Sequence, residues 1–315
     1  MSNEIETAQS KAEAILDNVE QVIIGKREVI ELAVIALISK GHLLIEDAPG
    51  VGKTILARSL AKSLGCSFKR IQFTPDMLPS DITGVSIYDQ KTGEFQFFPG
   101  PVMAQIVLAD EINRATPKLQ SALLECMEEG QITIDGVTRE MPHPFHILAT
   151  QNPIEYEGTF RLPETQLDRF LMRISLGYPS VSDEISIMNQ QQYQHPIKNL
   201  QPVASSADLE MLQEVVKGIY VDDLIKQYIV NLVGATRHHP AIFLGASPRG
   251  SLALYRTAQA KALICGRDYV LPDDVKALAE PVLAHRLITR TDSTDGKSGR
   301  DIVTKIIELV PVPSA

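Results

Sequence analysis

The fold of this chain is decided by the stretch Asp47-Ala48-Pro49-Gly50-Val51-Gly52-Lys53-Thr54. An apolar run at 41–46 precedes it and is typical of a strand, while the amphipathic spacing of 55–64 predicts a helix. Gly50 and Gly52 allow backbone N–H groups to curl around an anion, and the N-terminus of the helix adds the positive end of its dipole. The combination of strand, glycine-rich turn, Lys-Thr and helix therefore predicts a phosphate-binding loop.

Two side chains of this loop indicate what it binds. Lys53 can reach the β- and γ-phosphates of a nucleotide, and Thr54 can supply a hydroxyl ligand to Mg²⁺. The general pattern has glycine where this chain has Asp47, so the loop departs from it at one position. An ordinary strand–turn–helix with incidental glycines is the alternative, and Gly-Lys-Thr in this structural setting argues against it.

The composition is that of an ordinary globular protein. The chain has 315 residues, 44% of them apolar and 22% charged, which suggests two domains and a sizeable core. It has no apolar window long enough to cross a membrane, and its acidic first residues lack the profile of a signal peptide. Cys66, Cys126 and Cys265 are too far apart to indicate a zinc site or a disulfide framework. We therefore expect a cytoplasmic protein without membrane insertion.

The charge balance bears on the choice of partner. A net charge of −9 weakens the case for a nucleic-acid-binding protein, because such proteins need a basic surface that displaces counterions. Tryptophan is absent and aromatic residues make up 5% of the chain, which disfavours a surface built for base stacking. Nucleic acid is therefore not the expected ligand.

The order of the predicted elements indicates an α/β fold of the P-loop NTPase kind. Strands that alternate with helices form a parallel sheet with helices on both faces, and such sheets bind ligands at the carboxyl ends of their strands. Besides the elements around the phosphate loop, the pattern predicts strands at 67–73, 105–111 and 145–150, and helices at 7–20, 26–39 and 117–130.

Two β-hairpins interrupt this order, at about 83–98 and 131–141. The second is expected to turn at Asp135-Gly136. A short surface hairpin without a task is the alternative for the first. The side chains expected on one face of the first hairpin are those of Val85, Ile87, Phe95 and Phe97.

A domain boundary is expected near residue 178, which divides the chain into 1–178 and 179–315. Pro248 and Pro272 suit the first positions of helices, with Ser247 as a cap. The second domain is predicted to be all-helical, with helices at 182–193, 207–217, 222–237, 247–265, 272–285 and 300–309.

Asp110 and Glu111 add hydrolytic chemistry to the predicted nucleotide site. They follow directly on an apolar strand beside the phosphate loop. An acid at the position of Asp110 can order the Mg²⁺ shell, and Glu111 is placed to polarise a water for in-line attack on the γ-phosphate. The alternative is a pair of solvated carboxylates that open a turn.

Three further side chains are candidates for stabilising the transition state of phosphoryl transfer. Asn152 ends another strand, where its amide can bind the γ-phosphate or the attacking water, although Asn-Pro after a strand is usually only a turn. Arg169 and Arg249 can stabilise charge during phosphoryl transfer, although each alone is more often a surface ion pair.

Taken in order, these residues resemble an AAA+ ATPase module, and over nearly the whole chain the sequence resembles the MoxR family. The general match rests on Lys53-Thr54, Asp110-Glu111, Asn152, Arg169 and Arg249, at the positions of Walker A, Walker B, sensor 1, arginine finger and sensor 2. The narrower match rests on the strings at 46–54, 110–115, 149–153 and 162–170, and an acid at Asp47 is usual in MoxR-like chains.

The resemblance implies an AAA+ core with a C-terminal helical lid. It implies that the two hairpins point toward a central pore or a partner surface, and that the segment containing Ile24 and Gly25 packs on adenine. It further implies that Thr54 and Asp110 hold Mg²⁺, that Glu111 is the base and that Asn152 is a sensor. The phosphate-loop residues implied to bind ATP are Pro49, Gly50, Val51, Gly52, Lys53, Thr54 and Ile55.

The resemblance also implies shared sites between subunits. Arg249 would read the γ-phosphate from the lid, whereas Arg169 would act in trans on the ATP of a neighbouring copy. Such an arrangement requires a ring, usually a hexamer. Arg161 and Arg114 lie near the expected interface and are open alternatives to Arg169 as the finger.

For cellular function, the resemblance implies a chaperone-like ATPase that remodels a client or helps to insert its metal cofactor. Members of the family typically act with a partner that carries a von Willebrand factor A domain. The chain lacks the Asp-x-Ser-x-Ser motif of that domain, so we expect the partner to be a separate chain. The alternatives are an AAA+ nucleic-acid motor, which the acidic charge disfavours, and a nucleotide-gated scaffold with negligible turnover, which Glu111 disfavours.

Overall fold

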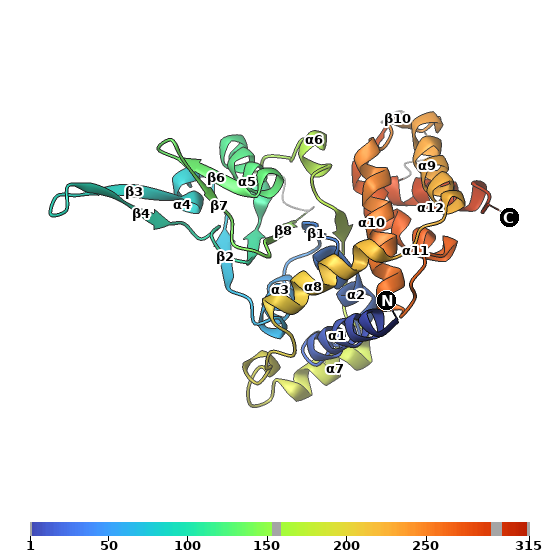
Figure 1. Ribbon diagram of the computed structural model, residues 1–315, viewed down its shortest axis with the longest axis horizontal. Helices are drawn as coiled ribbons and strands as arrows, with labels where there is room; N and C mark the ends of the chain where they lie inside the picture. Colours follow the sequence, from blue (N-terminus) through green and yellow to red (C-terminus); the bar gives the residue numbers. More distant parts are fainter. Residues whose placement is uncertain (1, 153–158, 291–297, 314–315) are drawn as a thin grey trace.

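The computed structural model of the chain describes residues 2–152, 159–290 and 298–313, and its centre is a five-stranded parallel sheet (Figure 1). The strands lie in the order β2-β5-β8-β1-β9, so that β5, β8 and β1 are inside and β2 and β9 form the edges. Their bounds are Leu43–Glu46 for β1, Phe68–Gln72 for β2, Ile106–Asp110 for β5, His146–Gln151 for β8 and Met172–Ile174 for β9.

The inner strands are continuous apolar runs because both faces of the sheet are covered. Every residue of β5 is buried, and alternate side chains enter two different hydrophobic clusters. The parallel register pairs Asp110 with Gln72 and Glu46 with Gln151, so the strands end together at one edge of the sheet. This edge is the one at which the sequence predicts a ligand.

Helices cover both faces, as predicted for a P-loop NTPase. On one face, the cluster around Leu43 and Ile45 includes α1 (Ser2–Glu20), α2 (Arg27–Ile38) and α3 (Lys53–Ser63). On the other face, the cluster around Leu44 and Val107 includes the short helix α4 (Pro79–Thr83) and the helix α5 (Pro117–Glu129).

The strand β9 was not predicted. It has three residues, which is shorter than the runs that identify a strand by pattern, although Met172 and Ile174 are apolar and buried. Its pairing with β1 is a long-range contact in which Leu43 lies beside Met172. Because β9 runs parallel to β1, it carries the residues that follow it to the edge where the phosphate loop begins.

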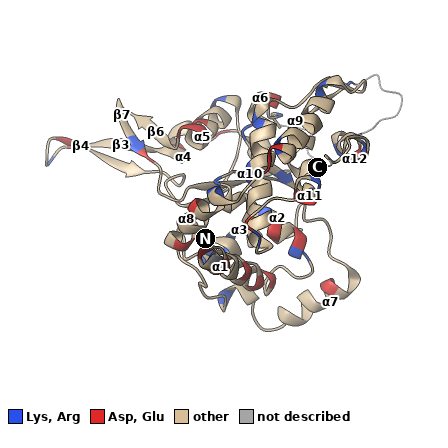
Figure 2. Ribbon diagram, turned by 45° about the vertical axis from the view of Figure 1, so that its right-hand side comes forward, with Lys and Arg blue, Asp and Glu red and all other residues tan. Residues whose placement is uncertain are grey.

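Both predicted hairpins are present. They are formed by β3 (Gly84–Asp89) with β4 (Glu94–Pro99) and by β6 (Gln131–Ile134) with β7 (Val137–Glu140). The first projects from the body on the side away from the C-terminal helices, and its strands are almost uncharged up to a charged tip (Figures 1 and 2).

The prediction that Val85, Ile87, Phe95 and Phe97 share one face of the first hairpin was wrong. Val85 pairs with Phe98 and Tyr88 pairs with Phe95, so odd-numbered residues of β3 lie opposite even-numbered residues of β4. Directly opposed residues share a face, so Val85 and Ile87 lie with Phe98. Phe95 and Phe97 lie on the opposite face with Tyr88. The length of the turn sets this register, and alternation within each strand does not reveal it.

The C-terminal segment is helical, and each of its predicted helices is present within a few residues of its expected bounds. Ser247 caps α10 by accepting a hydrogen bond from the backbone N–H of Arg249, and Pro248 begins that helix as predicted. The helices are α7 (Val181–Gln190), α8 (Ser206–Val215), α9 (Asp223–His238), α10 (Pro248–Ile264), α11 (Pro272–Leu283) and α12 (Gly299–Leu309).

One addition to the predicted lid is a two-stranded antiparallel sheet of β10 (Ile242–Leu244) and β11 (Ile288–Thr289). The division of the chain near residue 178 stays a prediction. Within the described ranges, no helix is both long and apolar enough to cross a bilayer. The remaining short elements are α6 (Glu164–Leu167), η1 (Ile112–Arg114), η2 (Pro196–Lys198), η3 (Val216–Gly218) and η4 (Ala284–Arg286).

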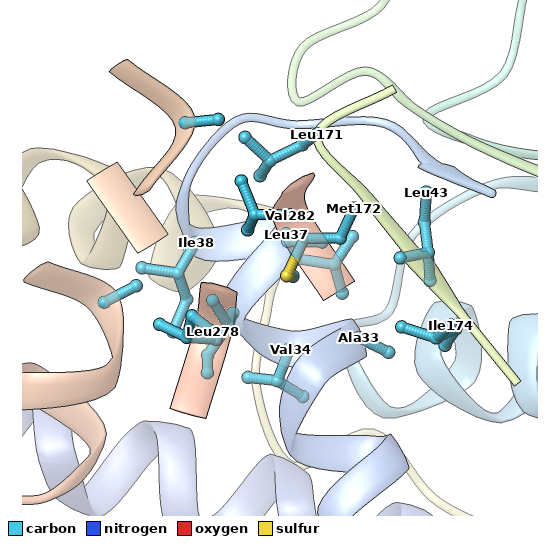
Figure 3. Packing of buried hydrophobic residues seen from close by; sticks show 14 of the residues in the cluster. Ala33, Val34, Leu37, Ile38, Leu43, Leu171, Met172, Ile174, Leu278 and Val282 are labelled. Carbon is cyan, nitrogen blue, oxygen red and sulfur yellow. The ribbon is translucent and has the colours of Figure 1, made fainter. Parts of the chain in front are cut away.

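The lid segment packs against α2 and, through α11, directly against the edge strand β9. Figure 3 shows Val34 and Leu37 of α2 between the strand residues Leu43 and Met172 and the helix α11, from which Leu278 points toward α2. All five side chains are buried. Core and lid therefore share one hydrophobic cluster, and the position of the lid is fixed by apolar packing as well as by polar contacts.

Two buried histidines lie at the amino ends of the strands. His42 accepts a hydrogen bond from the N–H of Ile147 at Nδ1 (3.0 Å), and its Nε2 lies 3.1 Å from the carbonyl oxygen of Met127. His146 lies between the carbonyl of Gly41 and the side-chain amide of Gln213. Burial lowers the pKa of His42 to about 4 and that of His146 to about 3, so both rings are neutral at pH 7.

These histidines predict loss of stability in mild acid. The unfolded chain takes up protons below the ordinary histidine pKa of about 6.5, whereas the folded chain does not until the pKa of each buried ring is reached. Between pH 7 and pH 5, each ring should therefore lower the free energy of unfolding by about 2 kcal/mol.

The variant His146→Asn tests this expectation. The drop in free energy of unfolding between pH 7 and pH 5, measured by urea denaturation, should be smaller than in the parent by about 2 kcal/mol. The matched control is His143→Asn, because His143 is exposed. An unchanged drop in His146→Asn would show that His146 does not cause the acid sensitivity.

Candidate functional site

The phosphate loop has the geometry that its glycines predict. Gly50 and Gly52 have φ values of +85° and +102°, a backbone conformation that strains any residue with a side chain. A Cβ at Gly50 would meet no atom within 4 Å, so conformation and not space requires glycine there. Gly52 caps α3, and Lys53 is the first residue of that helix. The loop thus leads directly into a helix N-terminus, where an anion is stabilised.

A cavity of about 320 Å³ lies between this loop and the carboxyl ends of the strands. It brings together parts of the chain that are far apart in sequence, and it contains the predicted residues Asp110, Glu111 and Asn152. Arg70, which was not predicted, also lines it. The other lining residues are Pro49, Gly50, Gly52, Lys53, Thr54 and Ile55.

The unusual acid Asp47 faces away from this cavity. Its Oδ2 accepts hydrogen bonds from the N–H of Gly177 (2.7 Å) and the hydroxyl of Ser175 (2.9 Å), and its Oδ1 accepts one from Ala48. Burial alone would raise the pKa of the Asp47 carboxyl, but these hydrogen bonds outweigh burial and hold the pKa below its usual value. Asp47 therefore ties the start of the loop to the segment after β9, which glycine could not do.

Asp110 is held on both of its oxygens. Its Oδ1 accepts a hydrogen bond from the hydroxyl of Thr150 (2.5 Å), and its Oδ2 accepts from Nε and Nη2 of Arg70 (2.9 and 2.7 Å). A cation thus already sits against this carboxylate. Sequence reasoning assigned no role to Arg70 or Thr150, because only the register of β2, β5 and β8 brings them to Asp110.

Glu111 leaves the strand in a left-handed conformation, with φ of +58°. This conformation is costly for a residue with a side chain, by roughly 1–2 kcal/mol. The backbone N–H of Glu111 donates to the hydroxyl of Thr150 (2.9 Å), and Arg114 pairs with its carboxylate at 3.0 Å. The turn therefore aims the carboxylate along the cavity wall, and Arg114 is engaged within its own chain.

Asn152 lies directly after β8 and is 9% exposed. Asn152 lines the same cavity as the phosphate loop, and its carbonyl oxygen lies 3.4 Å from the side-chain nitrogen of Asn113. The end of β8 thus brings Asn152 to the cavity of the phosphate loop.

A second, more apolar cavity of about 210 Å³ adjoins the first. Ile24, which the resemblance places against adenine, lines it together with Val22 and Ile23. Gly25 does not line it; a Cβ at Gly25 would lie 2.3 Å from the carboxylate of Asp183, so this position excludes a side chain. The residues that line both cavities are Gly50, Gly52 and Ile55.

Arg169 and Arg249 lie together, away from the phosphate loop. Nη2 of Arg169 is 3.0 Å from Glu128 Oε2, and Nη2 of Arg249 is 2.5 Å from Glu128 Oε1. Both arginines line a separate cavity of about 280 Å³ between α5, the segment before β9 and α10.

The sheet explains the position of Arg169. It precedes β9, at the amino ends of the strands, whereas the phosphate loop follows the carboxyl end of β1. Arg249 was expected to read a γ-phosphate from the lid, but α10 places it beside Arg169 and not in the phosphate cavity of its own chain. Arg161 is exposed, and no ion pair joins it to another residue in the described part of the chain.

The sheet order, the phosphate loop and the converging strand-end residues define a P-loop nucleotide-binding protein of the AAA+ class. Comparison with family models agrees: residues 42–172 match the "ATPase family associated with various cellular activities (AAA)", and residues 234–306 match the "AAA lid domain".

Similar proteins extend over nearly the whole chain. Protein YeaC of Bacillus subtilis, which is uncharacterised, is 53% identical over 95% of this chain and 93% of its own length. Chaperone MoxR1 of Mycobacterium tuberculosis is 42% identical over 96% of this chain and 82% of its own length. The crystal structure of a candidate ATPase from Cytophaga hutchinsonii superposes with a TM-score of 0.93, at 38% identity, and covers 99% of this chain and 98% of that one. The chain therefore belongs to the MoxR family of AAA+ ATPases.

Proposed function

We propose that this AAA+ ATPase binds Mg²⁺ and ATP across its two adjoining cavities and hydrolyses the γ-phosphate with help from a neighbouring copy. The observation that carries the proposal is the phosphate cavity itself. It combines a helix N-terminus, Lys53, the strand-end acids Asp110 and Glu111, and the amide of Asn152.

The two cavities suit the two ends of ATP. Lys53 and the N–H groups at the start of α3 would bind the triphosphate, while the apolar cavity beside Ile24 would take adenine. Nζ of Lys53 donates to the carbonyl oxygen of Asp47 at 2.6 Å, within its own loop. ATP binding would exchange that neutral acceptor for a charged one.

Thr54 and Asp110 fit a magnesium site, because both present oxygen ligands to the same cavity. The guanidinium of Arg70 against Asp110 indicates that this carboxylate attracts a cation at that place. Bound Mg²⁺ would neutralise charge on the phosphates. Arg70 would then have to release Asp110, and Thr150 would keep the carboxylate oriented.

Hydrolysis would use residues already held at the strand ends. Glu111 would take the proton of the attacking water, because its backbone is fixed by Thr150 and its carboxylate borders the phosphate cavity. Asn152, which lines the same cavity, would orient the water or the γ-phosphate.

The charge-stabilising arginines would come from the neighbouring copy in a ring. Arg169 and Arg249 are paired with one carboxylate, Glu128, at a site separate from the phosphate cavity, so both suit action in trans. Arg114 is engaged with Glu111, which makes it a weaker candidate for the finger, and Arg161 stays an alternative. A closed ring, which we propose to be a hexamer, would give every ATP the arginines of the next copy.

The motion of this ring would act on another protein. In the first hairpin, Phe95 is 73% exposed and Ile87 is 52% exposed, which suits contact with a client or partner. We propose a chaperone-like role in client remodelling or metal-cofactor insertion, with a separate partner chain that carries a von Willebrand factor A domain. A pull-down with a hydrolysis-blocked variant and ATP would identify the client.

The phosphate-loop assignment predicts that Lys53→Ala loses ATP affinity. A charge-assisted hydrogen bond contributes about 1.5–3 kcal/mol, so ATP should bind about 10- to 100-fold more weakly. A fluorescent-nucleotide titration measures the effect. The control is Arg58→Ala, which removes an exposed cation from the same helix. Parent affinity in Lys53→Ala would refute the assignment.

A further inference from the structure

Arg286 is a buried arginine that connects the lid to the core. It ends η4, directly after α11, and its side chain is only 3% exposed. Nε donates to Asp168 Oδ1 (2.9 Å), and Nη2 donates to the carbonyls of Phe170 (2.7 Å) and Asp168 (3.3 Å). Nη1 donates to the carbonyls of Leu171 (3.1 Å) and Val282. All five N–H groups of the guanidinium are therefore used.

Most of these acceptors flank Arg169. Asp168 precedes it, Phe170 and Leu171 follow it, and all of them lie in the turn between α6 and β9. A single guanidinium thus holds the backbone on both sides of Arg169 and satisfies carbonyls outside regular secondary structure. His285 belongs to the same cluster, because its Nε2 lies 3.1 Å from the carbonyl oxygen of Phe170 and 2.9 Å from Nη1 of Arg286.

The same carboxylate that binds Arg286 also reaches the helix of Arg249. Oδ2 of Asp168 accepts a hydrogen bond from the hydroxyl of Ser247 (3.0 Å), and Ser247 caps α10 two residues before Arg249. Glu128 then pairs with both Arg169 and Arg249 from the core side. The two arginines are therefore joined twice, once through Asp168 and once through Glu128.

We infer that Arg286 is a positioning residue. It holds Arg169 in place and, through Asp168, also holds Arg249, so that both arginines are oriented together toward the ATP bound by the neighbouring copy. The inference rests on the proposed trans action of these arginines. Its physical basis is preorganisation, because the cost of orienting the catalytic groups is met when the chain folds and not when the transition state forms. It also makes the position of the lid a condition for catalysis in the next subunit.

Arg286 is charged and fixed although it is buried. Burial lowers its pKa to about 10, with Asp168 acting in the opposite direction and Arg249 in the same direction. It therefore stays charged at neutral pH. The guanidiniums of Arg169 and Arg249 pair with Glu128, and that of Arg286 pairs with Asp168.

A mixed ring tests the inference. One subunit carries Arg169→Ala and keeps its phosphate loop, while the other carries Lys53→Ala and supplies the arginines. Adding Arg286→Lys to the second subunit keeps the charge but cannot reproduce the five hydrogen bonds. Turnover in the mixed ring should fall by about 100-fold, as expected for displaced catalytic groups. Arg286→Lys alone should keep the parent affinity for a fluorescent ATP analogue.

The matched control is Arg267→Lys in the same subunit. Arg267 also makes two hydrogen bonds to a buried lid carboxylate, that of Asp274 (2.8 and 2.6 Å), but it does not contact the turn around Arg169. Mixed-ring turnover should therefore change little. Equal turnover with and without Arg286→Lys would overturn the inference, as would a loss of ATP affinity in Arg286→Lys alone, because that would indicate general disruption.

A second variant is decisive if Arg286→Lys fails to fold. Ser247→Ala removes the link between Asp168 and α10, and turnover of the mixed ring should fall roughly 3- to 10-fold, as for one lost hydrogen bond. Ser205→Ala is the control, because Ser205 caps α8 in the same way without contacting Asp168. Equal turnover in Ser247→Ala and Ser205→Ala would overturn the inference. No turnover in the original mixed ring would instead refute the proposed trans action.

Discussion

A Glu111→Gln chain is expected to bind ATP as tightly as the parent and to hydrolyse it about 10²–10⁴ times more slowly. Glutamine has nearly the size of glutamate and keeps an oxygen for the contact with Arg114, so the turn around residue 111 should persist. It cannot accept the proton of the attacking water. In this variant, ATP affinity should therefore stay at the parent value while the turnover rate falls.

A nucleotide titration and the turnover rate at saturating ATP measure the two effects. The matched control is Glu308→Gln, the same chemical change at an exposed position of α12. Turnover within about two-fold of the parent would remove Glu111 from the role of base, since a general base contributes at least about 10² in rate. Loss of ATP binding would instead assign Glu111 to the structure of the phosphate cavity.

The second large effect is expected at Arg169. An Arg169→Ala chain should lose about 10³–10⁵ in turnover, the range for an arginine that stabilises charge in phosphoryl transfer. Its own phosphate cavity should be unaffected, because Arg169 lies at the opposite ends of the strands. ATP affinity should therefore stay at the parent value.

Mixing Arg169→Ala with Lys53→Ala subunits should restore part of this turnover. In a randomly mixed ring, roughly one interface in four joins an intact phosphate loop to an intact arginine. The assay needs mass spectrometry to demonstrate mixed oligomers. If Arg169→Ala gives no rescue in such oligomers but Arg161→Ala or Arg114→Ala does, the finger is reassigned to that residue.

Local interactions explain why much of the molecule could be predicted. The phosphate loop depends on the φ values of Gly50 and Gly52. The helix α10 begins at Pro248, and Ser247 is its N-cap residue. Each of these features is set by residues a few positions apart, so the sequence pattern is sufficient. The resemblance of the quoted strings to MoxR-like chains then identified the family, which the comparisons confirmed.

Features that depend on strand order could not be predicted in this way. The short strand β9, the facing of the first hairpin and the contacts of Arg70 and Thr150 with Asp110 are set by pairing between distant segments. The grouping of Arg249 with Arg169 likewise depends on the tertiary structure, which brings the start of α10 to Glu128 near the end of α5. No local pattern contains that information.

For this protein, the sequence by itself determined a phosphate loop, two strand-end acids, an amide directly after β8 and a helical lid, because glycine conformation, helix caps and apolar periodicity act over short stretches of chain. Only the tertiary structure decided which groups Asp47 contacts and where Arg169 and Arg249 lie. The reason is the parallel sheet, which gathers the phosphate-binding residues at the carboxyl ends of its strands and leaves Arg169 at the amino ends.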